Sequence, residues 1–173
     1  AAATAPSPTY TDGDAPMLQT GGTNYGSFTI GAYGSGTYTM SNGVSYAGDL
    51  TIGYQGTYNQ SGGSQIVTGN ISIDEQQIDY GQAYEAGSFN LSGGQVSAGG
   101  IYSIGFYTQT GGTNCVSGGF AVAGGEEVRM SVSGGLLSVN HLDVYPAYVG
   151  GVSLTGGTLI ITNTLFVQGI SSL

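Results

Sequence analysis

The chain has 173 residues, 34 of them glycine, a formal net charge of −9 and Arg129 as its single Lys or Arg. Binding nucleic-acid phosphates or an anionic membrane surface needs cations, so this composition argues against both partners. The length corresponds to one domain, and 39% hydrophobic residues suffice for a packed core. Because Gly, Ser, Thr, Tyr and β-branched residues dominate, we expect an all-β fold.

The first sixteen residues lack the repeat that follows them and contain Pro6, Pro8 and Pro16. We therefore expect an extended N-terminal arm over residues 1–16, which includes Tyr10. The chain begins with alanines and without Met, which fits a mature end left by signal-peptide cleavage, so we expect an extracellular protein. No window approaches 18 apolar residues, and we expect no membrane insertion.

A hydroxyl residue followed by a glycine pair recurs throughout residues 17–173. The first residues of these pairs are Gly21, Asn42, Gly62, Gly93, Gly111, Gly134 and Gly156. Asn replaces Gly at positive φ better than other residues, so the copy at Asn42 fits the pattern.

Two columns of residues precede these pairs. Four positions earlier stand Met17, Tyr38, Tyr58, Phe89, Tyr107, Met130 and Val152. Two positions earlier stand Gln19, Met40, Gln60, Leu91, Gln109, Val132 and Leu154. Residues two apart share one face of a strand. We expect the three Gln side chains of the second column to point inward and to bond to turn backbone.

A second strand is expected after each pair, with its two outer residues on one face. The expected segments are 28–30, 50–52, 71–73, 102–104, 120–122, 142–144 and 165–167. Units of about twenty residues are too short to bury their own apolar face, so they must stack. This predicts a parallel β-helix, or solenoid, of about seven coils over residues 17–173, which we expect to be right-handed. A Greek-key sandwich is the competing fold, but it would not require same-face columns in every unit.

One interval between pairs is longer than the others and holds an acidic loop insertion at 74–86. Its carboxylates are those of Asp74, Glu75, Asp79 and Glu85. Clustered carboxylates can hold Ca²⁺, which makes these four residues weak candidate ligands. The ligand spacing of an EF-hand loop is absent, so we favour a solvated lateral loop and expect no cofactor.

The phrases at 58–63 (YNQSGG), 89–94 (FNLSGG) and 107–114 (YTQTGGTN) resemble bacterial autotransporter-type passenger repeats and related Gly-rich surface repeats. The resemblance covers about residues 17–169 and concerns architecture rather than activity. It implies a right-handed β-helix exported to the cell surface, with a role in adhesion, a matrix or a sheath. The chain is much shorter than such passengers.

Catalysis is not expected. Polysaccharide lyases of this fold class would want Lys or Arg near a bound metal, and only Arg129 is present. Glu126-Glu127 and Asp143 would be the carboxylates for a polysaccharide hydrolase, but no pattern places them in a groove. Cys115 and His141 form no recognisable nucleophile pair, and we expect Cys115 to be a small buried thiol.

The last coil is the most apolar stretch, and we expect it to mediate self-assembly through Ile160, Ile161, Leu165, Val167 and Ile170. Exposed strand edges at the end of a solenoid pair with any matching chain. We therefore expect a structural protein that forms a head-to-tail filament, sheath or matrix. The partner surface would be the N-terminal coil or the arm with Pro6, Pro8 and Tyr10. The alternative is a surface adhesin or carbohydrate-binding module that stacks sugars on exposed tyrosines.

Overall fold

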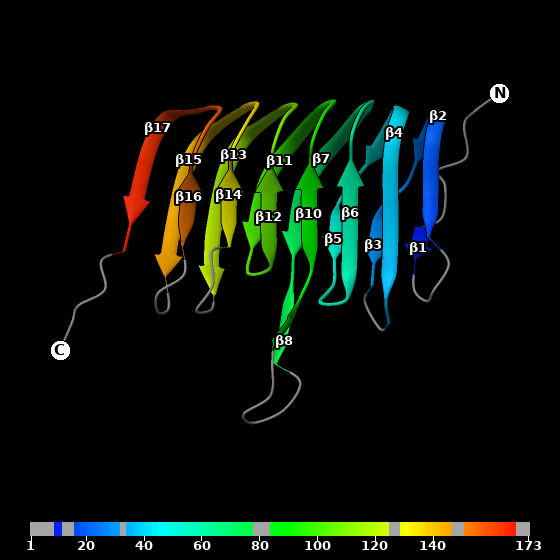
Figure 1. The fold of residues 1–173 in the computed structure, drawn as a ribbon, viewed down its shortest axis with the longest axis horizontal. Coiled ribbons are helices and arrows are strands. Elements are labelled where there is room, and N and C mark those ends of the chain that lie inside the picture. Colours follow the sequence, from blue (N-terminus) through cyan, green and yellow to red (C-terminus); the bar gives the residue numbers. More distant parts are fainter. Residues whose placement is uncertain are drawn as a thin grey trace.

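The computed structural model describes residues 9–11, 16–31, 34–77, 84–124, 129–146 and 151–168. Over this part the chain is all-β and winds into a parallel β-solenoid of about six turns (Figure 1). The predicted fold class is thereby confirmed, and the predicted number of coils is close.

Each turn passes through three faces of the solenoid. The first face contains β2 (Met17–Tyr25), β4 (Gly36–Ala47), β6 (Gly56–Gln60), β10 (Ser88–Leu91), β12 (Phe106–Gln109), β14 (Met130–Val132) and β16 (Val152–Leu154). After the glycine corner, the second face contains the ends of β2 and β4 and the beginnings of β7 (Ser64–Ile73), β11 (Gln95–Ser103), β13 (Thr113–Gly124), β15 (Leu136–Pro146) and β17 (Thr158–Val167). The third face contains β1 (Thr9–Thr11), β3 (Phe28–Ile30), β5 (Leu50–Ile52) and the ends of the last five strands.

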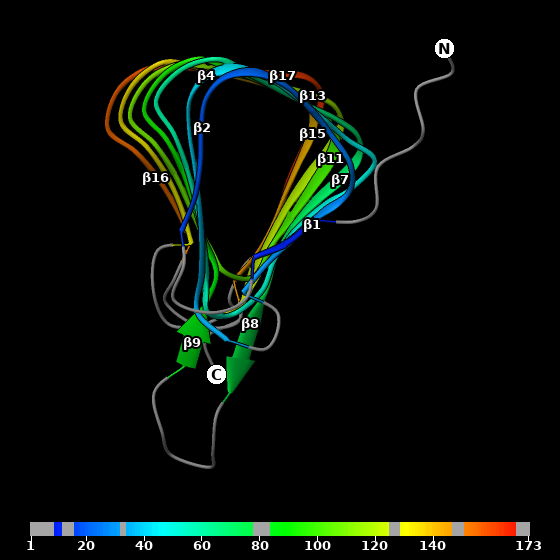
Figure 2. The same cartoon turned by 90° about the vertical axis from the view of Figure 1, so that its right-hand side faces the viewer.

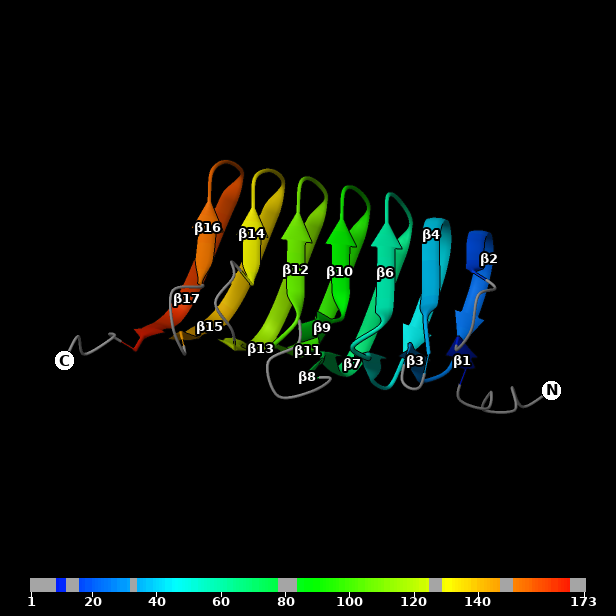
Figure 3. The same ribbon diagram turned by 60° about the horizontal axis from the view of Figure 1, so that its bottom comes forward.

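The strands of each face run in the same direction, as Figure 3 shows for the first face. Seen from the N-terminal end, the chain ascends the first face and descends the other two while it recedes from the viewer (Figure 2). This clockwise path makes the solenoid right-handed, as expected.

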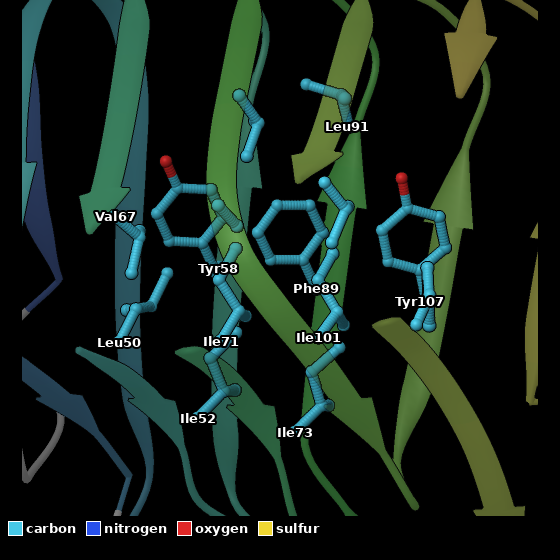
Figure 4. Close-up of a cluster of buried hydrophobic side chains, with 14 of the residues drawn as sticks. Leu50, Ile52, Tyr58, Val67, Ile71, Ile73, Phe89, Leu91, Ile101 and Tyr107 are labelled. Atoms are coloured by element: carbon cyan, nitrogen blue, oxygen red, sulfur yellow. The ribbon is translucent and has the colours of Figure 1, made fainter. Parts of the chain in front are cut away.

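Both columns that precede the glycine corners are aligned in register from turn to turn. In the first column Tyr38, Tyr58, Phe89 and Tyr107 are buried and stack along the solenoid, with ring centroids 5.4, 4.8 and 5.4 Å apart. Figure 4 shows three of these rings beside the aliphatic side chains of the second and third faces. Aromatic pairs add about 0.5–1.5 kcal/mol each beyond the area they bury, so this column is a main source of core stability.

The prediction for the Gln column is confirmed. Gln60 Nε2 donates to the backbone oxygen of Gln95 at 2.9 Å, and Gln109 Nε2 donates to that of Leu136 at 2.9 Å. The hydroxyls of Tyr58 and Tyr107 donate to the amide oxygens of Gln60 and Gln109 at 2.9 and 2.7 Å. Gln60 and Gln109 therefore each satisfy the core tyrosine of their own strand and tie the first face to the second. Gln19 instead accepts from the Tyr38 hydroxyl of the next turn and donates to the backbone oxygen of Val44 at 3.1 Å.

One predicted strand is wrong by a single residue. The expected segment 102–104 placed Tyr102 inside, but Ile101 pairs with Ile71 and is buried, whereas Tyr102 is 47% exposed. The register shifts between Ala98 and Gly100, and a slip of one residue moves every side chain to the opposite face.

The glycine corners of successive turns pack closely against one another. A Cβ on the first glycine of a pair would come within 2.3–2.4 Å of the carbonyl oxygen of the hydroxyl residue one turn earlier. This holds for Gly62, Gly93, Gly111, Gly134 and Gly156. Since real Cβ atoms do not approach so closely, only glycine fits these positions without a shift of backbone.

Candidate functional site

The last turn, made of β16 and β17 and here called the C-terminal rung, is open. A hollow of about 400 Å³ at its outer side is lined by Leu142, Val144, Gly151, Val152, Leu154, Leu159, Ile161, Leu165 and Val167. Leu154, Leu165 and Val167 are 52, 57 and 58% exposed. Leucines and valines are normally buried side chains, so this rung presents the solenoid core to its surroundings.

The hollow brings together three of the residues expected to mediate assembly, Ile161, Leu165 and Val167. Ile160 alternates with Ile161 along β17 and is 44% exposed outside the hollow. Ile170 lies outside the described residues. Leu142 and Val144, which were expected to share one face of a strand but not to take part in assembly, belong to the preceding turn and form the floor of the hollow.

The strand edges of this rung face outward. Among the described strands, β16 pairs with β14 alone and β17 with β15 alone. The other edge of each strand therefore directs backbone N–H and C=O groups away from the solenoid, ready to pair with another strand.

The first turn, made of β1, β2 and β3 and here called the N-terminal rung, is closed at the level of its core side chains. Phe28 is 3% and Gln19 is 7% exposed. The predicted arm contributes to this rung, because β1 pairs in parallel with β3 and places Tyr10 level with Thr29. Pro6 and Pro8 lie outside the described residues. The free edges among the described strands at this end belong to β1 and β2.

Two exposed tyrosines lie on the side of the solenoid near the N-terminal rung. Tyr25 and Tyr46 are 53 and 39% exposed, and their rings stack at 5.1 Å with an interplanar angle of 8°. Each ring covers one face of the other, so the pair offers a sugar less ring surface than two separate tyrosines would.

The acidic insertion contains an antiparallel hairpin of β8 (Glu75–Gln77) and β9 (Tyr84–Ala86). Gln55 Nε2 donates to Glu85 Oε2 at 2.5 Å, which ties this hairpin to the turn before it. Burial raises the pKa of the Asp74 carboxyl above its usual value. Asp79 and the side chain of Glu75 lie outside the described part, and the side chains inside it include no cluster of three His, Cys, Asp or Glu residues that could hold a metal ion.

Cys115 is exposed, so the prediction of a buried thiol is wrong. Its neighbours Asn114 and Val116 occupy the inward positions of β13, and Asn114 Nδ2 donates to the Tyr107 hydroxyl at 2.8 Å. Alternation along the strand then directs Cys115 outward.

The other candidate polar residues are dispersed. The side chain of His141 lies 3.0 Å from that of its neighbour Asn140. Arg129 is buried and lies over the ring of Phe106, 4.7 Å from its centroid. Asp143 lies in β15 on the third face, and Glu126 and Glu127 lie outside the described residues.

No family model, no curated protein and no solved structure matches the chain. The part of the chain that the structure describes contains no helix long and apolar enough to cross a membrane.

Proposed function

We propose that the protein is an extracellular structural subunit that assembles head to tail into a filament, sheath or matrix. The observation that carries the proposal is the open C-terminal rung, where an apolar hollow coincides with free parallel strand edges. A contiguous apolar patch that is exposed to solvent marks a surface that binds another molecule.

Covering the rung stabilises the assembly in two ways. Burying a Leu or Val completely is worth about 1.5–3 kcal/mol, and Leu154, Leu165 and Val167 each have roughly half of that still to gain. A second strand layer also satisfies the backbone groups of β16 and β17, which have a neighbour on one edge only among the described strands.

The two ends favour a heterologous contact. A second copy that docks its N-terminal rung on the C-terminal rung keeps the strands of the two copies parallel and in the same direction. A contact between two C-terminal rungs would instead place their strands antiparallel, whereas neighbouring turns of the solenoid pair in parallel. Heterologous contacts that do not close give open filaments.

The test places charges in the hollow. We expect the unaltered chain to form filaments in negative-stain electron microscopy and to sediment as large assemblies. The double variant Ile161→Lys/Val167→Lys should remain a folded monomer, because it buries two ammonium groups at the junction. The matched control Ser97→Lys/Tyr102→Lys puts the same charge on exposed side positions of a middle turn and should leave assembly intact.

A second variant addresses the other end. Deletion of residues 1–16 removes β1, and with it the N-terminal edge of the third face. We expect this deletion to abolish assembly as well. Filaments that survive both the double lysine substitution and the deletion would refute the proposal.

A further inference from the structure

The second glycine corner contains the only Asn-Gly dipeptide of the chain, Asn42-Gly43. The chain has eight asparagines, and the other seven are followed by larger residues. At this corner the positive φ belongs to Gly43 (φ 90°), and Asn42 is not in the left-handed region. Backbone conformation therefore does not account for the asparagine, and its side-chain chemistry becomes the relevant property.

The Asn42 side chain is folded back on the peptide group that follows it. The N–H of Gly43 donates to Asn42 Oδ1 at 2.8 Å. Because Cγ is bonded to Oδ1, the Gly43 nitrogen lies beside the carbonyl carbon of the same carboxamide. A bond between this nitrogen and Cγ closes a five-membered ring. Two groups held together in one chain react far faster than the same groups free in solution.

The Gly43 backbone lies between the paired segments of its strand. Pairing of β4 with β6 ends at Met40, and pairing with β7 begins at Val44. The register against β2 is broken at the same corner. Among the described strands Gly43 therefore has no register partner, and no Cβ shields its nitrogen. Asn42 is exposed, so water reaches the carboxamide.

We infer that Asn42 is a site of spontaneous modification, at which attack by the Gly43 nitrogen converts the asparagine to aspartate or isoaspartate. In the first step the bond from the Gly43 nitrogen to Asn42 Cγ forms, hydroxide takes the proton of that nitrogen, and the side-chain nitrogen leaves as ammonia. In the second step one water molecule opens the cyclic imide. Opening at Cγ gives aspartate, and opening at the Asn42 backbone carbonyl gives isoaspartate. The net reaction consumes one water and releases one ammonia, so the solvent supplies every reactant.

The two products should affect the solenoid differently. Aspartate keeps the backbone and adds one negative charge at an exposed position. Isoaspartate adds a methylene to the main chain. A Cβ on Gly43 would come within 2.5 Å of the Gly22 oxygen, and a Cβ on Gly63 within 2.7 Å of the Gly43 oxygen. The corners on both sides therefore leave no room for an added backbone atom, and isoaspartate should loosen the packing of the first three turns.

The experiment follows this conversion in the full folded chain. The protein is incubated at neutral and at alkaline pH, then unfolded and cut with chymotrypsin. Cleavage after Tyr38 and Tyr46 releases residues 39–46, which contain Asn42. Mass spectrometry should show the replacement of an amide by an acid in this peptide, with a separately eluting isoaspartate form. Conversion should be faster at alkaline pH, because the attacking nitrogen must lose its proton.

Two comparisons show whether ring closure is the route. Conversion at Asn42 should be at least about tenfold faster than at Asn140, whose following residue His141 carries a Cβ. The variant Asn42→Gln keeps the carboxamide but lengthens the side chain by one methylene, so that the ring would have six members. Its peptide should stay unchanged over the same time. The variant Asn42→Asp provides the aspartate product directly and should unfold in urea near the midpoint of the unaltered chain, whereas the isoaspartate form should unfold at a lower urea concentration.

Three results would overturn the inference. If Asn42 stays unchanged in the folded chain but converts in the chain unfolded in urea, the corner protects it. If Asn42→Gln converts as fast as the unaltered chain, water attacks the amide directly and the Gly43 nitrogen takes no part. If neither the folded nor the unfolded chain converts, the dipeptide is inert. The reaction requires a single chain, so its outcome is independent of the proposed assembly.

Discussion

The middle turns and the C-terminal rung carry the same columns of residues in very different surroundings. In the column two positions before the corner, Leu91 is 1% exposed and Leu154 is 52% exposed. On the third face, Phe120 is 0% and Leu165 is 57% exposed. Both comparisons join large apolar side chains at equivalent register positions, so the difference in exposure arises from the neighbouring turn. The side chains of an internal turn are covered by the turns on both sides of it, as expected of a solenoid in which each repeat contacts only its neighbours.

The largest expected effect is a difference between equivalent truncations in these two regions. Phe89→Ala should cost about 3–5 kcal/mol of unfolding free energy, because the ring is fully buried between Tyr58 and Tyr107. Leu165→Ala in the monomer should cost less than about 1 kcal/mol, because over half of that side chain is already exposed. Urea unfolding of both variants in the lysine-substituted monomer measures the contrast. Equal losses would mean that the C-terminal rung is covered within a single chain.

Sequence reasoning succeeded where positions are counted over a short distance from a glycine corner. The columns two and four positions before each corner come out in register because no bulge intervenes. The third-face segments lie beyond a second bend, where Gly99 and Gly100 add a bulge, and there Tyr102 was placed on the wrong side. Each bulge between a glycine corner and a residue therefore adds an error to the prediction of which face that residue lies on.

The strand immediately after each corner was not predicted from sequence. Had alternation been applied to 113–116, it would have placed Asn114 and Val116 inside and Cys115 outside, as the structure does. The signal is faint because polar residues occupy several inward positions of this face, including Ser45 and Gln65. Both polar and apolar side chains fill the same column, which hides the period-two pattern that identifies a strand.

Alkaline pH should weaken the middle turns through their buried tyrosines. Burial raises the pKa of the Tyr38, Tyr58 and Tyr107 hydroxyls above their usual value near 10. The stabilising contribution is fully present below pH 10 and is lost as pH rises towards the raised values, because only the unfolded chain then ionises. Tyr58 and Tyr107, the two more deeply buried hydroxyls, should each cost about 1.4 kcal/mol of unfolding free energy per pH unit above 10. Urea midpoints at pH 8, 10 and 11 measure the loss.

The matched control for alkaline unfolding is Tyr58→Phe/Tyr107→Phe. This variant should show a shallower decline above pH 10, while its stability at pH 8 falls because Gln60 and Gln109 lose hydrogen-bond donors. An unchanged slope would show that the ionising groups are other than these tyrosines.

A smaller effect is expected when a Gln of the core column two positions before the corner is replaced by an apolar residue, which separates the hydrogen-bonding from the packing contribution to stability. Gln109→Leu installs the side chain that Leu91 already places in the same column, so the change tests hydrogen bonding with little change of shape. It removes the donor to the Leu136 oxygen and the acceptor for Tyr107, and it should cost about 1–3 kcal/mol. Unfolding in urea is the measurement. A gain in stability would mean that apolar packing outweighs the network, and that the Gln residues of this column serve specificity.

The smallest expected effect is that of salt, which should change the association of two copies but not the stability of the turns within one chain. Copies with a net charge of −9 repel each other, and about 0.5 M salt reduces the Debye length to a few ångströms. Salt should therefore lower the critical concentration for filaments several-fold while hardly changing the unfolding midpoint of the monomer. The turns within one chain already lie together irrespective of salt, whereas two copies must first approach against their like charge. If salt instead dissolved filaments, ion pairs rather than the apolar hollow would hold the junction, and the lysine substitutions at Ile161 and Val167 would need another explanation.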